Sequence, residues 1–137
     1  STTDYAKLDG LHTFYKPDGI TEIEKQRTSF LEKHAVSIND IDLSITGKNG
    51  DAGEDKIYEQ LGKTVFDSKD TVDYKYLCGE YPTAAAFAMW LAANTIKAGK
   101  LPAMLNATVT TDKKIDRVLI YNHYQGIHHS LSLLSAC

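Results

Sequence analysis

The residues with the clearest chemical potential lie at a turn that leads into a helix, between positions 75 and 86. The segment reads KYLCGEYPTAAA, with a thiol at Cys78 and a carboxylate at Glu80. Pro82 suits the first turn of a helix, where its missing N–H leaves no hydrogen bond unmade. The unpaired N–H groups and the dipole of such a helix stabilise negative charge. The pattern therefore indicates a candidate acyl-transfer site at this turn.

Cys78 itself has two interpretations. Thiols at helix N-termini have lowered pKa values and react as thiolates, which favours a nucleophile. However, no spacing in the sequence places a histidine beside Cys78 as its base. Its neighbours Leu77 and Gly79 also suit a small buried residue, because free cysteine is among the most buried residue types. The buried interpretation is favoured, and the catalytic one stays open.

Three histidines near the C-terminus, His123, His128 and His129, raise the question of a metal site. If residues 127–134 form a strand, the two adjacent imidazoles point to opposite faces of the sheet. No carboxylate or thiol lies nearby with a recognised ligand spacing. We therefore expect no metal. One of His128 and His129 should face solvent while the other hydrogen-bonds inside the fold, and His123 should lie on the preceding loop, within reach of a pocket.

A glycine-rich segment, GKNGDAG at 47–53, suggests a phosphate-binding loop. It lacks the Gly-Lys-Ser/Thr ending and the spacing of that motif. A plain turn between a strand and a helix, with Asp51 or Glu54 near the helix start, is the favoured interpretation.

Composition narrows the class of protein. The chain has 137 residues, 42% of them hydrophobic, which fits one domain with a core of its own. A net charge of -3 gives no global basic field for nucleic acid or anionic lipid. The two cysteines are too few for a disulfide framework. The longest apolar run is too short to span a bilayer. The first residues are polar and do not resemble a secretory signal. We expect a cytoplasmic protein with no cofactor and no membrane or nucleic-acid partner.

Periodicity predicts the elements that position these residues. Strands are expected at 8–15, 41–46, 72–76, 117–121 and 127–134, and helices at about 21–34, 54–62 and 82–97. Thr21 followed by Glu24 predicts a capping box at the start of the first helix. The order β-α-β-α-β-α-β-β indicates a layered α/β domain with a mixed, mostly parallel sheet. Because no helix separates the last two strands, the final one should be antiparallel to its neighbour.

The third helix is unusually rich in alanine. Residues 84–93 read AAAFAMWLAA, which is apolar all round, so we expect a helix buried on most sides. Met89 and Trp90 are predicted to be core residues. Exposed in a monomer, such a helix would leave a large apolar patch. A partner packed against it is therefore expected, either a complementary half or a second copy of the chain.

Four segments, taken in order, carry a family resemblance. They are a helix followed by Asp-Ile-Asp at 30–42, the segment from Thr46 to Leu61, the Lys75–Ala86 turn with Gly79, Ala84 and Ala85 in register, and the strand–turn–strand from Val118 to Ser130. The whole chain resembles the C-terminal half of β-ketoacyl-acyl carrier protein synthases, the condensing enzymes of the thiolase-like fold. Their motifs at the last three places are HGTGT, KSxxGHxxGAAGA and NSFGFGGxNAS. The family's repeated half is also β-α-β-α-β-α-β-β.

The resemblance implies site residues and also departures from the family pattern. In register, the two active-site histidines fall at Thr46 and Glu80, and His123 lies in the closing turn. These three residues are the implied catalytic positions, and the implied acyl-pocket residues are Lys75, Gly79, Asn122 and Gly126. A glutamate carboxylate repels the oxyanion that a neutral imidazole would stabilise. The family's nucleophilic cysteine belongs to the N-terminal half, which has no counterpart in this sequence.

Two functions follow from the resemblance. The first is a non-catalytic subunit or half-domain of fatty acid or polyketide biosynthesis that shapes an acyl pocket for a partner, as chain-length factors do. The second is the C-terminal part of an active acyltransferase whose cysteine lies on another chain. A scaffold without an acyl ligand is a third, plainer option. The implied partners are a complementary N-terminal ketosynthase half or a homo-oligomer, and an acyl carrier protein.

Overall fold

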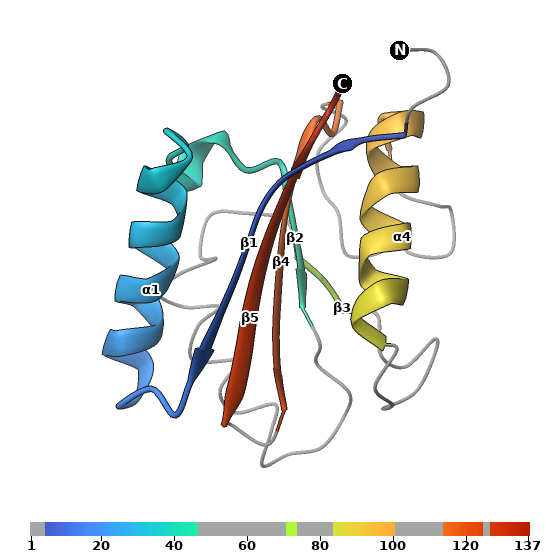
Figure 1. Cartoon of the computed structure of the whole chain (residues 1–137). Helices are drawn as coiled ribbons and strands as arrows, with labels where there is room; N and C mark the ends of the chain where they lie inside the picture. The colour runs from blue at the N-terminus through green and yellow to red at the C-terminus, as the bar shows by residue number, and fades with distance from the viewer. Residues whose placement is uncertain (1–4, 47–70, 74–83, 101–113, 125–126) are drawn as a thin grey trace.

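The computed structural model describes residues 5–46, 71–73, 84–100, 114–124 and 127–137. Its elements, in chain order, are β1 (Lys7–Tyr15), α1 (Ile20–Lys33), a 3-10 turn (Ile38–Asp40), β2 (Leu43–Thr46), β3 (Thr71–Asp73), α4 (Ala84–Ala98), β4 (Arg117–Tyr124) and β5 (His128–Ser135). All five predicted strands are present, along with the first and third predicted helices (Figure 1). The helix predicted at about 54–62 lies outside the described residues.

The five strands form one mixed sheet in the order β1-β5-β4-β2-β3. β5 is antiparallel to both of its neighbours, β1 and β4, while β4, β2 and β3 pair in parallel. Every strand except β5 therefore runs in the same direction. This arrangement agrees with the prediction of an antiparallel final strand and a small, mixed α/β domain.

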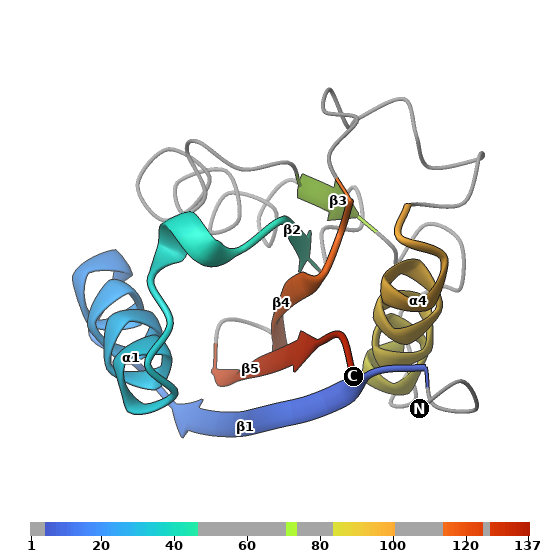
Figure 2. The same cartoon turned by 90° about the horizontal axis from the view of Figure 1, so that it is seen from above.

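The two helices cover opposite faces of the sheet (Figure 2). Residues alternate between these faces along each strand, so the core divides into two parts. The part on the α4 side contains Leu43, Ile45, Val118, Ile120 and Leu134 together with Ala88, Leu91, Ala92 and Ile96. The part on the α1 side contains Leu119, Tyr121, Leu131 and Leu133 together with Ile23, Phe30 and Leu31. All four residues of β2 are buried, because the strand is covered on both faces.

The start of α1 differs from the predicted capping box. The N-cap is Gly19, in the left-handed region with φ 90°, and Thr21 lies inside the first turn. The backbone N–H of Asp18 donates to the carboxylate of Glu22. The prediction at Thr21 was therefore wrong, because glycine takes the positive φ that ends the preceding turn and Glu22 supplies the acceptor at the helix start.

Asp42 ties the start of β2 to the start of β4. Its Oδ2 accepts hydrogen bonds from the backbone N–H groups of Asp116 and Arg117, each at 3.0 Å. Just before it, Ser37 and Asp40 form a capping box around the 3-10 turn. This carboxylate thus supports the register between two strands whose starts are joined across 75 residues of sequence.

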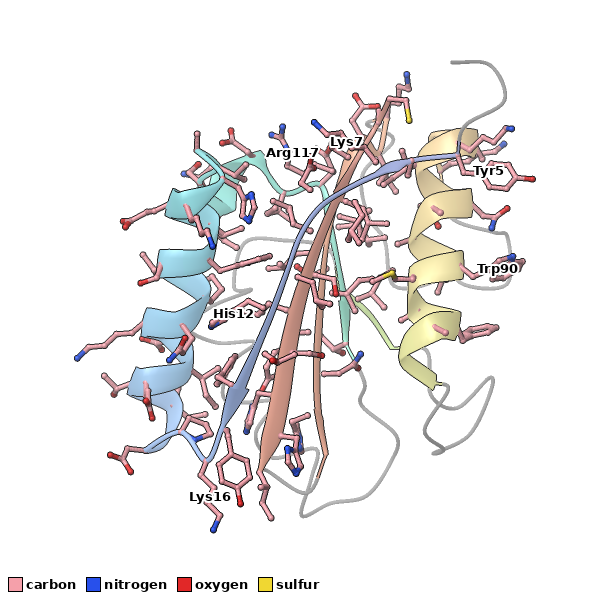
Figure 3. The ribbon with its side chains drawn as sticks, in the orientation of Figure 1. Tyr5, Lys7, His12, Lys16, Trp90 and Arg117 are labelled. Atoms are coloured by element: carbon pink, nitrogen blue, oxygen red, sulfur yellow. The ribbon has the colours of Figure 1, made fainter. Side chains whose placement is uncertain are left out.

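One face of α4 packs on the sheet and the other is exposed. Ala88, Leu91 and Ala92 are buried, and Met89 packs at the edge of the same core. Trp90, in contrast, is 58% exposed and points away from the sheet (Figure 3). The expected burial on most sides, with Trp90 in the core, is wrong for this chain by itself, because the sheet offers the helix only one surface. No helix in the described segments could cross a bilayer; α4, the most apolar, has 15 residues.

Candidate functional site

Three of the seven implied site residues lie in the described part of the chain. Thr46 is the last residue of β2, and Asn122 and His123 lie near the end of β4. The other four, Lys75, Gly79, Glu80 and Gly126, lie outside the described residues, as does Cys78. The site can therefore be built only around the ends of β2 and β4.

Thr46 and His123 lie on the same face and at the same end of the sheet. Thr46 pairs with Tyr121 in the parallel register of β2 and β4. His123 is two residues farther along β4, so it projects from the same face about 7 Å beyond Tyr121. Both are 3% exposed. The fold thus brings the hydroxyl and the imidazole to neighbouring strands on the side covered by α1.

His123 is part of β4, whereas the sequence predicted a loop at this position. The strand continues to Tyr124 because His123 pairs with His129 on β5 and Tyr124 pairs with His128. The predicted strand stopped at Tyr121 because the polar residues that follow resemble a turn. Pairing with β5 provides a reason for the extension that single-strand periodicity does not contain.

A row of stacked rings surrounds His123 on the α1 face. His129 on β5 is the direct cross-strand partner of both His123 on β4 and Phe14 on β1. The centroids of His123 and His129 are 5.6 Å apart at an interplanar angle of 28°, and those of Phe14 and His129 are 5.0 Å apart at 20°. Such offset contacts between directly opposed residues stabilise both the pairing and the ring orientations.

The adjacent histidines on β5 have different environments, as predicted. His128 is exposed, and its ring lies 5.1 Å from that of Tyr15. His129 is 2% exposed, and its Nδ1 lies 2.7 Å from the hydroxyl oxygen of Tyr121. In a neutral imidazole, either the hydroxyl donates to a bare Nδ1 or Nδ1–H donates to the hydroxyl oxygen. Within the described residues, no three or more His, Cys, Asp or Glu side chains gather closely enough to hold a metal ion.

Asn122 is separated from His123 by the sheet itself. Neighbouring strand residues point to opposite faces, so Asn122 projects toward the α4 side, as Ile120 does. It is half-buried and pairs with Ser130 on β5. Asn122, implied for the acyl pocket, and His123, implied for catalysis, thus belong to different faces of the same strand end.

Sequence reasoning missed a cavity between β1 and α1. His12 and His34 both line this cavity of about 160 Å³, together with Leu11, Gln26, Ser29, Phe30 and Lys33. His12 points from β1 toward α1 (Figure 3). The available signal was Gly10 within a strand, because such a glycine often marks a close approach by another group.

Comparison with known proteins identifies the fold. No family model and no curated protein sequence matches this chain. Among solved structures, the ishigamide ketosynthase/chain length factor matches with a TM-score of 0.77 at 14% identity, covering 97% of this chain and 38% of that one. PfaC keto synthase–chain length factor matches with a TM-score of 0.72 at 13% identity, covering 96% of this chain and 13% of that one.

A third similar structure is AntDE:AntF, a type II polyketide synthase acyl carrier protein in complex with its ketosynthase. Its TM-score is 0.61 at 15% identity, covering 97% of this chain and 34% of that chain. The likenesses show that this chain has the fold found in ketosynthase and chain length factor proteins, as the sequence resemblance implied. The chain spans well under half the length of each of these structures.

Proposed function

We propose that this chain is a β-ketoacyl synthase-like half-domain that corresponds to the C-terminal half of such enzymes. In this proposal it shapes an acyl pocket with a complementary N-terminal half in fatty acid or polyketide biosynthesis and is not catalytic by itself. The observation that carries the proposal is the superposition of 97% of the chain on only 38% of the ishigamide ketosynthase/chain length factor. A ketosynthase-like fold of two halves needs a second half, which another segment or another chain must supply.

The surface around α4 supports a partner. Trp90 projects from the outer side of α4, with the ring of Phe87 5.6 Å away. On the same side of the sheet, Leu8 and Leu11 of β1 are also exposed. Leu11 shares this face because it is opposite Ser132, which in turn is opposite Ile120 in the α4-side core. Exposed apolar groups gathered on one side of a small domain are typical of an interface.

The described site supports a structural role better than proton transfer. Thr46 occupies the place of the first family histidine in the resemblance. A hydroxyl can donate one hydrogen bond, but it does not take up a proton near neutral pH as imidazole does. Thr46 is 3% exposed, so in the described part of the chain it packs beneath the surface, where it can support a pocket wall. We therefore assign it to shaping the pocket rather than to catalysis.

A second candidate is the C-terminal part of an active 3-oxoacyl-acyl carrier protein synthase whose cysteine nucleophile lies on another chain. The observation in its favour is that His123 shares a sheet face and a strand end with Thr46. An imidazole at this position would serve as the general acid or base, with Glu80 completing the set. An acyl carrier protein is a proposed partner in either case.

The two candidates are separated by reconstitution. The tagged full chain is purified from its native source, the copurifying polypeptide is identified, and light scattering gives the stoichiometry. An equimolar complex with an N-terminal ketosynthase-like half supports the proposal, and a chain that stays a monomer without such a partner contradicts it.

In the complex, Glu80→Ala should leave acyl transfer unchanged if this half is non-catalytic. A loss of about 10²-fold or more would favour the active acyltransferase. Glu32→Ala, at an exposed position on α1, is the matched control.

A further inference from the structure

The cavity between β1 and α1 is lined by three flat rings. Phe30 lies at its centre, with the ring of His12 stacked at 6.1 Å and 20° and that of His34 edge-on at 5.0 Å and 70°. Leu11 borders the cavity from β1, although its side chain belongs to the opposite, α4-side face of the strand. Ring faces and edges that line a cavity can contact another planar group, although His12 already stacks on Phe14 at 5.6 Å and 24°. The cavity therefore has the shape and apolar character of a slot for a small flat molecule.

The shape depends on Gly10. A β-carbon at this position would lie 2.3 Å from Nε2 and 2.6 Å from Cε1 of His34, so any side chain would displace the imidazole. Because Gly10 has none, His34 reaches across from the end of α1 onto the backbone of β1. Gly10 thus leaves the space that the imidazole of His34, one wall of the cavity, occupies.

The polar groups of the cavity include several donors. Nε2 of His12 lies 2.7 Å from Oε1 of Gln26. Since an amide oxygen only accepts, this bond places a proton on Nε2 and leaves the Gln26 amide N–H₂ available as a donor. Ser29 contributes a hydroxyl and Lys33 an ammonium group, and no carboxylate is among the lining residues.

We propose that this cavity binds a small planar carboxylate, with its flat body against Phe30 and the imidazoles and its charge directed to Lys33 and Ser29. Charge-assisted hydrogen bonds to a carboxylate are among the strongest that side chains make. A cavity of about 150 Å³ holds a benzene ring, and this one is of about 160 Å³. The carboxylate of Asp9, also on β1, is not among the lining residues and lies 3.5 Å from the ammonium group of Lys7. The proposal is independent of the role of Thr46 and His123.

The test is a titration of the full chain with benzoate, followed by the imidazole NMR signals. We expect saturable shifts of the His12 and His34 signals, with a dissociation constant on the order of 1 mM for a ligand of this size. The exposed His128 should not shift and serves as the internal reference. Benzyl alcohol, which has the ring without the charge, and inorganic phosphate, which has the charge without the ring, should each bind about tenfold more weakly.

Variants connect the shifts to the cavity. Lys33→Gln should weaken benzoate binding about tenfold, whereas Lys25→Gln, the same change at an exposed position of α1 outside the cavity, should leave it unchanged. Gly10→Ala should abolish binding by displacing His34. Ser29→Ala provides a milder second variant, with a several-fold loss, if Gly10→Ala perturbs folding. The proposal is wrong if benzoate leaves the His12 and His34 signals unmoved, if phosphate binds as tightly as benzoate, or if both lysine variants weaken binding equally.

Discussion

Tyr121 and His129 are joined by a buried hydrogen bond across two neighbouring strands, with 2.7 Å between the hydroxyl oxygen and Nδ1. The bond is diagonal, because Tyr121 pairs directly with Leu131 while His129 pairs with His123. It fixes the orientation of His129, which stacks on His123 on one side and on Phe14 on the other. The stacking of His129 with His123 and Phe14 therefore depends on the hydroxyl group of Tyr121 in β4.

The first prediction concerns this bond. Tyr121→Phe keeps the ring but removes the hydroxyl, and it leaves a buried nitrogen without that partner. We expect a loss of about 1–3 kcal/mol in the free energy of unfolding, measured by urea denaturation. Tyr15→Phe, at a position that is exposed in the structure, is the matched control and should change the stability by less than about 0.5 kcal/mol. Equal effects of the two substitutions would show that the hydrogen bond adds no net stability.

A second prediction tests the close approach of α4 to the sheet. Ala88 is fully buried, while Ala86 on the same helix is exposed. Ala88→Leu should force the helix and sheet apart and cost about 1–3 kcal/mol through overpacking. Ala86→Leu adds the same atoms where there is room and should be nearly neutral. Thermal unfolding of both variants measures the difference, and similar melting temperatures would mean that α4 does not pack tightly.

A third prediction uses Trp90, the only tryptophan of the chain, as a reporter of the partner. It is 58% exposed, so the isolated chain should show the red-shifted fluorescence emission of a solvated indole. Binding of a complementary half should shift the emission to the blue as the ring is buried. Trp90→Gln should weaken the complex at least tenfold while leaving the stability of the isolated chain within about 0.5 kcal/mol. An emission maximum that is unchanged in the complex would exclude α4 from the interface.

Arg27 provides a fourth prediction. Burial lowers the pKa of its guanidinium, and the nearby Glu24 carboxylate offsets part of this effect by raising it. Its Nε is buried without a hydrogen-bond partner among the described residues. Arg27 is half-buried, and replacing even a fully buried charge with a well-packed apolar side chain is often neutral or stabilising. Arg27→Met should therefore leave the free energy of unfolding unchanged or raise it by about 1 kcal/mol.

Lys25→Met, at an exposed position on the same helix, is the control for the loss of one positive charge. It should have little effect on urea denaturation. A loss of more than about 2 kcal/mol in Arg27→Met alone would show that the guanidinium is well compensated in the folded chain and that its desolvation is not a net cost.

Local patterns in the chain specified most of the elements. Apolar runs and turn residues predicted all five strands, and the absence of a helix between β4 and β5 predicted their antiparallel pairing. Gly99, with φ 77°, follows α4, and glycine in this conformation commonly ends a helix. Such features depend on residues that are close together in the sequence, so they can be predicted without knowledge of long-range contacts.

Long-range contacts decided the rest. The extension of β4 through His123 depends on its partner His129, and the exposure of Trp90 depends on which surface the sheet presents to α4. The cavity beside Gly10 exists only because His34, from the end of a helix, meets a strand more than twenty residues away. The types and spacing of residues determine hydrophobic periodicity and the positions of turns. The register between strands, and which sheet face each helix covers, are decided only when distant segments pack together.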